Sequence, residues 1–207
     1  MFIDVHAHLD DEAFEPDRHD VLENIKNAGI VVINAGANIA SSRFSVELAK
    51  NHENIYACVG VHPHDAKDVK KGYLEELEEL SKHAKVLALG EMGLDYHYEF
   101  SDREVQKKVF REQLMLAKKL NLPVVVHNRE AHQDTLDILR ESGVKKGLLH
   151  CYSGSLPMAE EFMKLGFSFS FGGVLTFKNA KNPKNIAKAL PLDKIMLETD
   201  CPYLSPE

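Results

Sequence analysis

Short apolar segments alternate with helix-like segments along the whole chain, and this alternation constrains the fold more than any other feature. The segments with strand composition are 2–8, 30–35, 55–61, 86–91, 123–127, 147–151, 167–171 and 194–199. Near-continuous apolar strands separated by helices are typical of a parallel sheet covered on both faces. Eight of them predict a (β/α)8 TIM barrel that fills residues 1–207 as a single domain. An open doubly wound sheet is the alternative, but no glycine-rich phosphate loop follows the first strand.

Helices are expected between these strands. The segments with helical patterning are 17–28, 41–50, 74–80, 101–120, 131–142 and 157–165. Ser41 and Ser42 are expected to cap the second of them. Ser101 and Glu104 have the spacing of a capping box, which predicts that the fourth helix begins at Ser101.

The overall composition excludes several classes of protein. A formal net charge of −7 argues against a broadly basic nucleic-acid binder, although bound divalent cations can supply a local positive field for phosphates. The three cysteines, Cys58, Cys151 and Cys201, are too few and too scattered for a disulfide framework or a zinc site built on thiols. No apolar run approaches the roughly 20 residues that span a membrane, and no secretory signal opens the chain. We therefore expect a cytoplasmic protein that does not contact membranes.

Histidines and carboxylates gather where the predicted strands end. A lone His-x-His such as His6 and His8 is more often a polar strand end than a metal site. Here, however, further residues of the same kinds end other strands: Glu91, His127, His150 and Asp200. Each is in phase with inward-facing apolar residues, and barrel active sites are built at the carboxyl ends of the strands. We therefore expect these side chains to converge.

Four imidazoles and two carboxylates form a mixed nitrogen and oxygen set that suits Zn²⁺, Mn²⁺, Fe²⁺ or Co²⁺. Six ligands are more than one catalytic ion needs, because such an ion keeps positions open for water and substrate. Two divalent ions bridged by a carboxylate use the set better. Glu91 is the expected bridge, since its strand lies midway between the two groups of histidines.

Six motifs, in order, resemble those of the TatD family of metal-dependent deoxyribonucleases, which have amidohydrolase-type barrels. The motifs are "DVHAHLD", "GVHPH", "GEMGLDYH", "VVVHNREAHQDTLDIL", "HCYSGS" and "LETDCPYL". The resemblance implies that His6, His8, Glu91 and Asp200 hold a first metal. It implies that His127 and His150 complete a second metal site, to which Glu91 bridges. The native ions would be Zn²⁺ or Mn²⁺, and Mg²⁺ could serve in an assay.

The same resemblance implies cytosolic hydrolysis of DNA phosphodiesters, often as an exonuclease. The negative net charge favours single strands or 3′ ends over a long duplex as the substrate. A water on the metal would become hydroxide, and Asp200 could accept its proton. His62, His64 and Arg129 would contact phosphate oxygens. Plainer roles compete with these: the two histidines could form a polar turn, and Arg129 could pair with Glu130. Asp95, expected in the loop after its strand, could orient a histidine.

The family usually continues beyond the strand that carries Asp200, so we expect the helix or helices after strand eight to be absent and that flank of the barrel to be exposed. Two other functions remain open. The same metal site could serve an amidohydrolase or an aminoacyl-ester deacylase. Alternatively, the chain could be an inactive metal-binding homologue. The oligomeric state is also left open.

Overall fold

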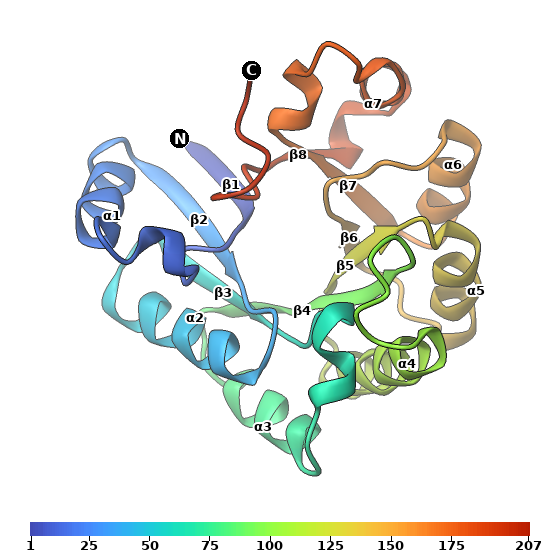
Figure 1. Ribbon diagram of the computed structural model, residues 1–207, viewed down its shortest axis with the longest axis horizontal. Helices are drawn as coiled ribbons and strands as arrows, with labels where there is room; N and C mark the ends of the chain where they lie inside the picture. The colour runs from blue at the N-terminus through green and yellow to red at the C-terminus, as the bar shows by residue number, and fades with distance from the viewer.

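The eight apolar segments form eight parallel strands in the computed structural model, which describes residues 1–207 (Figure 1). The strands are β1 (Phe2–Ala7), β2 (Ile30–Ala35), β3 (Ile55–Val59), β4 (Val86–Asp95), β5 (Val124–Arg129), β6 (Gly147–Leu149), β7 (Phe167–Phe171) and β8 (Ile195–Leu197). Each strand pairs with the next one along the chain, so their spatial order is the order of the sequence. The sheet curls into a nearly closed barrel, which confirms the predicted TIM-barrel fold.

The helices lie around the outside of this barrel (Figure 1). They are α1 (Arg18–Asn27), α2 (Ile39–Asn51), α3 (Tyr73–Leu80), α4 (Arg103–Leu120), α5 (His132–Ser142), α6 (Leu156–Lys164) and α7 (Lys181–Ala189). The sequence did not lead us to expect α7. None of these helices has both the length and the apolar run that a membrane span requires.

Two apolar clusters hold the barrel together. The larger one lies between the strands and the helices. The smaller one fills the barrel interior and consists of Ala35, Cys58, Ala88, Val125 and Leu148. Its small residues leave the upper part of the barrel to polar side chains. Burial raises the pKa of the Cys58 thiol to about 12, so this cysteine is an inert apolar side chain.

The predicted N-cap of α2 is wrong, because the cap is an asparagine three residues before Ser41. Asn38 is the N-cap: its side-chain oxygen accepts from the Ser41 amide at 3.0 Å, while the Ser41 hydroxyl accepts from the Asn38 amide at 2.9 Å. The helix therefore begins at Ile39, because an asparagine caps as well as a serine and stands one turn earlier.

The capping box expected at α4 is also wrong. Asp102 is the N-cap and accepts from the Glu104 amide at 2.8 Å, so the helix begins at Arg103. Ser101 is fully buried instead: its hydroxyl donates to the His64 carbonyl at 2.8 Å and accepts from the Lys67 amide at 3.1 Å. A tertiary contact thus replaces the local cap, and it fixes the loop that carries His64.

Strands β1 and β8 meet only near their carboxyl ends. The Asp200 amide donates to the His6 carbonyl at 2.9 Å, and the His8 amide donates to the Cys201 carbonyl at 2.8 Å. Below these bonds the flank is open, as expected: Phe2 is 70% exposed and Leu197 is 58% exposed. An apolar groove of about 410 Å³ runs beside them. Both chain termini lie on this side of the barrel (Figure 1).

Candidate metal centre

The polar residues at the strand ends come together at the carboxyl end of the barrel. Their ligand atoms form three groups, each with all atoms within 4.8 Å of one another: His6, Glu91 and His150; His6, His8 and Asp200; and His62, Glu91 and His127. All six residues predicted as metal ligands fall in these groups, and His62 joins them. The structure thus brings the set together, while its role in binding metal stays a prediction.

Glu91, at the middle of β4, is the only member whose two ligand atoms face different histidines. Its Oε2 lies 3.2 Å from His6 Nε2 and 3.5 Å from His8 Nε2. Its Oε1 lies 2.8 Å from His150 Nε2 and 3.0 Å from His127 Nδ1. The carboxylate is 3% exposed. Each oxygen therefore faces a separate set of imidazoles, as a bridging ligand requires.

The spacing of the nitrogens fits bound cations. His6 Nε2 and His8 Nε2 lie 3.2 Å apart, and His127 Nδ1 and His150 Nε2 lie 3.3 Å apart. Imidazole nitrogens that face each other with their lone pairs need a proton or a cation between them. Two nitrogens at the usual zinc–nitrogen distance of about 2.0–2.1 Å in a tetrahedral site are separated by about 3.4 Å. The donor set and its spacing therefore match a divalent ion.

Opposite charges in the centre outweigh the effect of burial. Burial disfavours the charged form of Glu91, but the surrounding imidazoles, with His150 foremost, hold its pKa well below the usual range. Burial also disfavours protonated His8. Its hydrogen bond with Asp200 and the charges of Glu91 and Asp200 nevertheless raise its pKa to about 9. Without a metal, the centre thus holds protons where cations would bind.

A second carboxylate supports the centre from behind. Asp95 Oδ2 accepts hydrogen bonds from His127 Nε2 and His64 Nε2, both at 3.0 Å, and its Oδ1 accepts from the Tyr98 amide at 2.9 Å. Burial opposes its charge, but these bonds bring its pKa well below the usual range. Asp95 is the last residue of β4 rather than a loop residue, because the strand stays paired with β5 as far as Arg129.

The three predicted substrate contacts occupy different surroundings. His62 lies inside the ligand cluster, with Nε2 at 3.5 Å from Glu91 Oε1, whereas His64 is bonded to Asp95. Arg129 is exposed, and its guanidinium lies 4.8 Å from the centre of the Tyr98 ring. Its suggested pairing with Glu130 does not form, since Glu130 pairs with His97.

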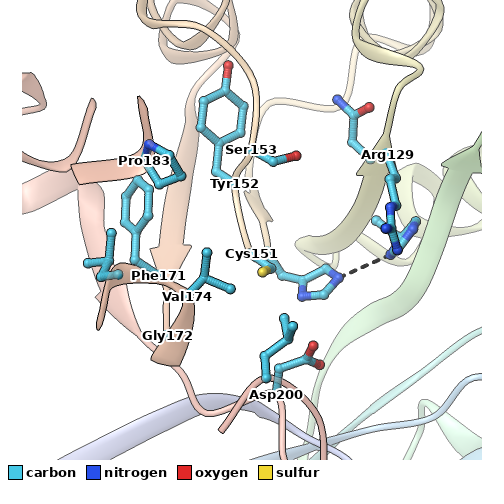
Figure 2. Close-up of a pocket in the computed structure, with 14 residues that line it drawn as sticks. Arg129, Cys151, Tyr152, Ser153, Phe171, Gly172, Val174, Pro183 and Asp200 are labelled. Atoms are coloured by element: carbon cyan, nitrogen blue, oxygen red, sulfur yellow. Dashed lines mark hydrogen bonds between the residues drawn. The ribbon is translucent and has the colours of Figure 1, made fainter. Parts of the chain in front are cut away.

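Two cavities open onto the centre. One, of about 540 Å³, lies over Glu91 and is bordered by His8, His64 and Tyr98. The other, of about 270 Å³, lies toward β6 and β7. Figure 2 shows this second cavity, with Phe171, Val174 and Pro183 on one side, Asp200 below and Arg129 on the other side. Arg129 and Asp200 border both cavities.

Sequence reasoning missed two buried polar residues beside the centre. Glu198 accepts from the Ser170 hydroxyl at 2.6 Å, and the same oxygen lies 3.7 Å from His150 Nδ1. Asn128 borders the smaller cavity, and neither its amide nitrogen nor its oxygen has a partner. Strand alternation places Glu198 on the same face as Asp200, but the sequence gives no sign of its contact with His150.

Comparisons with known proteins agree with this geometry. Residues 3–207 match the family model described as TatD related DNase. An uncharacterised metal-dependent hydrolase of Bacillus subtilis, YabD, is 44% identical over an alignment of 209 residues. The alignment covers all of this chain and 82% of the relative. The crystal structure of the TatD homologue YjjV from Escherichia coli superposes with a TM-score of 0.91 at 34% identity, covering all of this chain and 81% of that one. A TatD family hydrolase from Entamoeba histolytica gives a TM-score of 0.88 at 28% identity, covering 98% and 74%.

Proposed function

This chain belongs to the TatD family of metal-dependent hydrolases, and on that premise we propose that it hydrolyses DNA phosphodiester bonds at a two-cation centre. The observation that carries the proposal is the position of Glu91. One of its oxygens faces His6 and His8, and the other faces His127 and His150. A single carboxylate between two donor sets is the arrangement that a bridged pair of ions needs.

His6, His8 and Asp200 would hold one ion, and His127 and His150 the other, with His62 beside the second. Imidazole and carboxylate ligands together suit Zn²⁺ or Mn²⁺, whereas the Mg²⁺ of an assay would rely on the carboxylates. When bound, a divalent pair lowers the pKa of a coordinated water and stabilises charge on a transferring phosphoryl group.

The protein's own residues supply the remaining steps. Asp200 is ionised, since its bond with His8 and the nearby imidazoles outweigh its burial and lower its pKa. The ionised carboxylate can therefore accept the proton of the attacking water. Asp95 holds the His127 ring, so that Nδ1 faces the centre and Nε2 faces away. Arg129, which has no carboxylate partner, offers its guanidinium to phosphate oxygens at the mouth of both cavities.

Charge and cavity size favour a single-stranded end as the substrate. The net charge of −7 repels a long duplex, whereas one or two phosphates can enter the cavities beside the centre. The three free cysteines fit a reducing cytoplasm.

The test is a nuclease assay of metal-quantified protein on end-labelled single-stranded DNA, with Mg²⁺, Mn²⁺ or chelator. We expect cleavage that depends on the metal and is abolished in Asp200→Asn. Asp137→Asn, on the exposed face of α5, is the matched control and should cleave normally. Cleavage should weaken steeply as salt rises, because a polynucleotide releases counterions on binding.

Full metal occupancy without cleavage of DNA would overturn the proposal. Hydrolysis of acyl or aminoacyl esters by the same loaded protein would then identify a deacylase. If Asp200→Asn keeps both its metal and its cleavage activity, Asp200 takes no part in the reaction.

A further inference from the structure

Two aromatic rings stand exposed at the edge of the metal centre, in the loop between β4 and α4. Tyr98 is 49% exposed and Phe100 is 55% exposed. Their rings are stacked, with centroids 5.3 Å apart and planes 8° from parallel. Single exposed apolar residues are common on proteins, but a stacked pair beside a candidate active site is not explained by packing.

These rings adjoin the centre through one shared neighbour. The His64 ring meets Tyr98 and Phe100 edge-on, with centroid distances of 5.6 and 4.7 Å. His64 in turn donates to Asp95, which also holds His127. Tyr98 borders the cavity that lies over Glu91. A ligand whose reacting bond lies at the centre therefore has the rings within reach.

The loop that carries the rings is fixed in place. Asp95 Oδ1 accepts from the amides of His97 and Tyr98, at 3.0 and 2.9 Å. Gln106 of α4, which is fully buried, donates to the carbonyls of Asp95 and Ser101 at 3.0 and 2.8 Å. The rings are thus held in position before any ligand arrives, which lowers the entropy lost on binding.

The surrounding charges favour a ligand that carries phosphate. The carboxylates around the rings are paired: Glu99 with Arg103, Glu130 with His97, and Asp95 with His64 and His127. Arg129 has no such partner, and its guanidinium lies 4.8 Å from the centre of the Tyr98 ring. A planar apolar surface with one free cation above it suits a planar base attached to a phosphate.

We propose that Tyr98, Phe100 and Arg129, here called the aromatic shelf, bind an unpaired nucleobase of the strand whose phosphodiester lies at the metal centre. This inference rests on the proposed function and names the part of the substrate that the centre itself does not contact. Every base has a π face, so the shelf accepts all sequences. A base inside a duplex is already covered on both faces, so the shelf selects single strands and frayed ends.

The test measures binding, so that it does not depend on turnover. The probes are two short single-stranded oligodeoxynucleotides with uncharged methylphosphonate links at the end to be cleaved. One carries bases throughout, and in the other the terminal nucleotides are abasic. Dissociation constants are measured by fluorescence anisotropy on metal-quantified protein.

We expect Tyr98→Ala to weaken binding of the base-bearing probe by roughly 5- to 100-fold, which is the usual effect of removing one stacked base. It should leave binding of the abasic probe unchanged. Tyr98→Phe should bind both probes as the unaltered protein does, and Phe100→Ala should behave as Tyr98→Ala does. Phe44→Ala is the matched control, because Phe44 lies on α2, away from the aromatic shelf. Its ring is also exposed and has the Arg18 guanidinium over it at 5.1 Å. It should bind both probes normally.

The proposal would be wrong if Tyr98→Ala lost the same affinity for both probes, or lost affinity for neither. The proposed function fails separately. If the loaded protein cleaves no DNA but Tyr98→Ala still weakens only the base-bearing probe, the shelf stands and the nuclease reaction falls. If cleavage is normal and the two probes are not distinguished, the reaction stands and the shelf falls.

Discussion

At the scale of single residues, the centre is organised by carboxylates rather than by histidines. Glu91 faces five imidazoles directly, and Asp95 fixes one of these from the far side. For His127, the bond from Nε2 to Asp95 decides that Nδ1 is the nitrogen that faces Glu91. Changes at the carboxylates should therefore alter metal content before they alter the fold.

Replacing Glu91 with glutamine should reduce metal affinity by at least about 100-fold, because both donor sets lose the charge they share. Asp95→Asn should reduce it less, by about 10- to 100-fold, since His127 is the only predicted ligand that this residue contacts. Metal content after dialysis, measured by mass spectrometry, gives the order of the two effects. The reverse order would show that Glu91 does not bridge two ions.

The pH should act on the metal-free protein and on metal binding in opposite directions. His8 has a pKa of about 9 in the metal-free fold and about 6.5 in an unfolded chain. Its folded pKa is raised, so its stabilisation of about 3 kcal/mol is complete below pH 6.5 and is lost as the pH rises to about 9. Urea denaturation of the metal-free protein should show this decline.

Metal affinity should increase over the same range of pH, because binding must displace the proton of His8. Calorimetry in buffers of different ionisation enthalpy should show proton release at pH 7. Affinity that does not change between pH 6.5 and 9 would contradict the role of His8 as a ligand.

At the scale of secondary-structure elements, helix α4 holds the carboxyl ends of two strands. Gln113 is fully buried, and its side chain accepts from the Val61 amide at 2.8 Å and donates to the Val61 carbonyl at 2.9 Å. This segment continues directly into His62. The adjoining strands also approach closely: Gly93 of β4 has φ +144°, and a Cβ there would lie 2.0 Å from the His127 carbonyl oxygen.

Gln113→Leu should lower the free energy of unfolding by about 2–5 kcal/mol, because two buried backbone groups of Val61 lose their partners. Gln133→Leu, on the exposed side of α5, is the control and should change stability little. Urea denaturation of both variants measures the difference. Equal stabilities would show that water satisfies Val61.

The strands, the helices other than α7 and the polar strand ends could be predicted from sequence, whereas their supporting contacts could not. Apolar alternation defines each strand, and alternation places His127 and His150 inward. Several nearby polar residues could bond the same backbone group, and the sequence does not say which one does. This choice determines the caps at Asn38 and Asp102 and the bond from Ser101 to His64. That outcome is decided by tertiary packing. The positions of His62 and of Asp95 behind His127 likewise depend on how neighbouring strand ends meet.

At the scale of the whole molecule, the flank between β8 and β1 is the least covered part of the barrel. Phe2, Ile3 and Leu197 are exposed there beside an apolar groove. A contiguous apolar surface of this kind promotes association.

We expect self-association that grows with protein concentration, measured by light scattering after gel filtration. Phe2→Ser with Leu197→Ser should reduce it. Met115→Ser is the control, because Met115 is 71% exposed on α4, away from this flank. Association unaffected by the double change but reduced by the control would place the contact elsewhere.

The bonds that join His6 and His8 to Asp200 and Cys201 connect the first strand to the residues after the last one. Almost the whole chain must therefore leave the ribosome before these four residues can meet. At about 5–20 residues per second, His6 waits roughly 10 to 40 seconds for Asp200. The group of His6, His8 and Asp200 is thus a late product of translation, whereas Glu91, His127 and His150 can meet earlier.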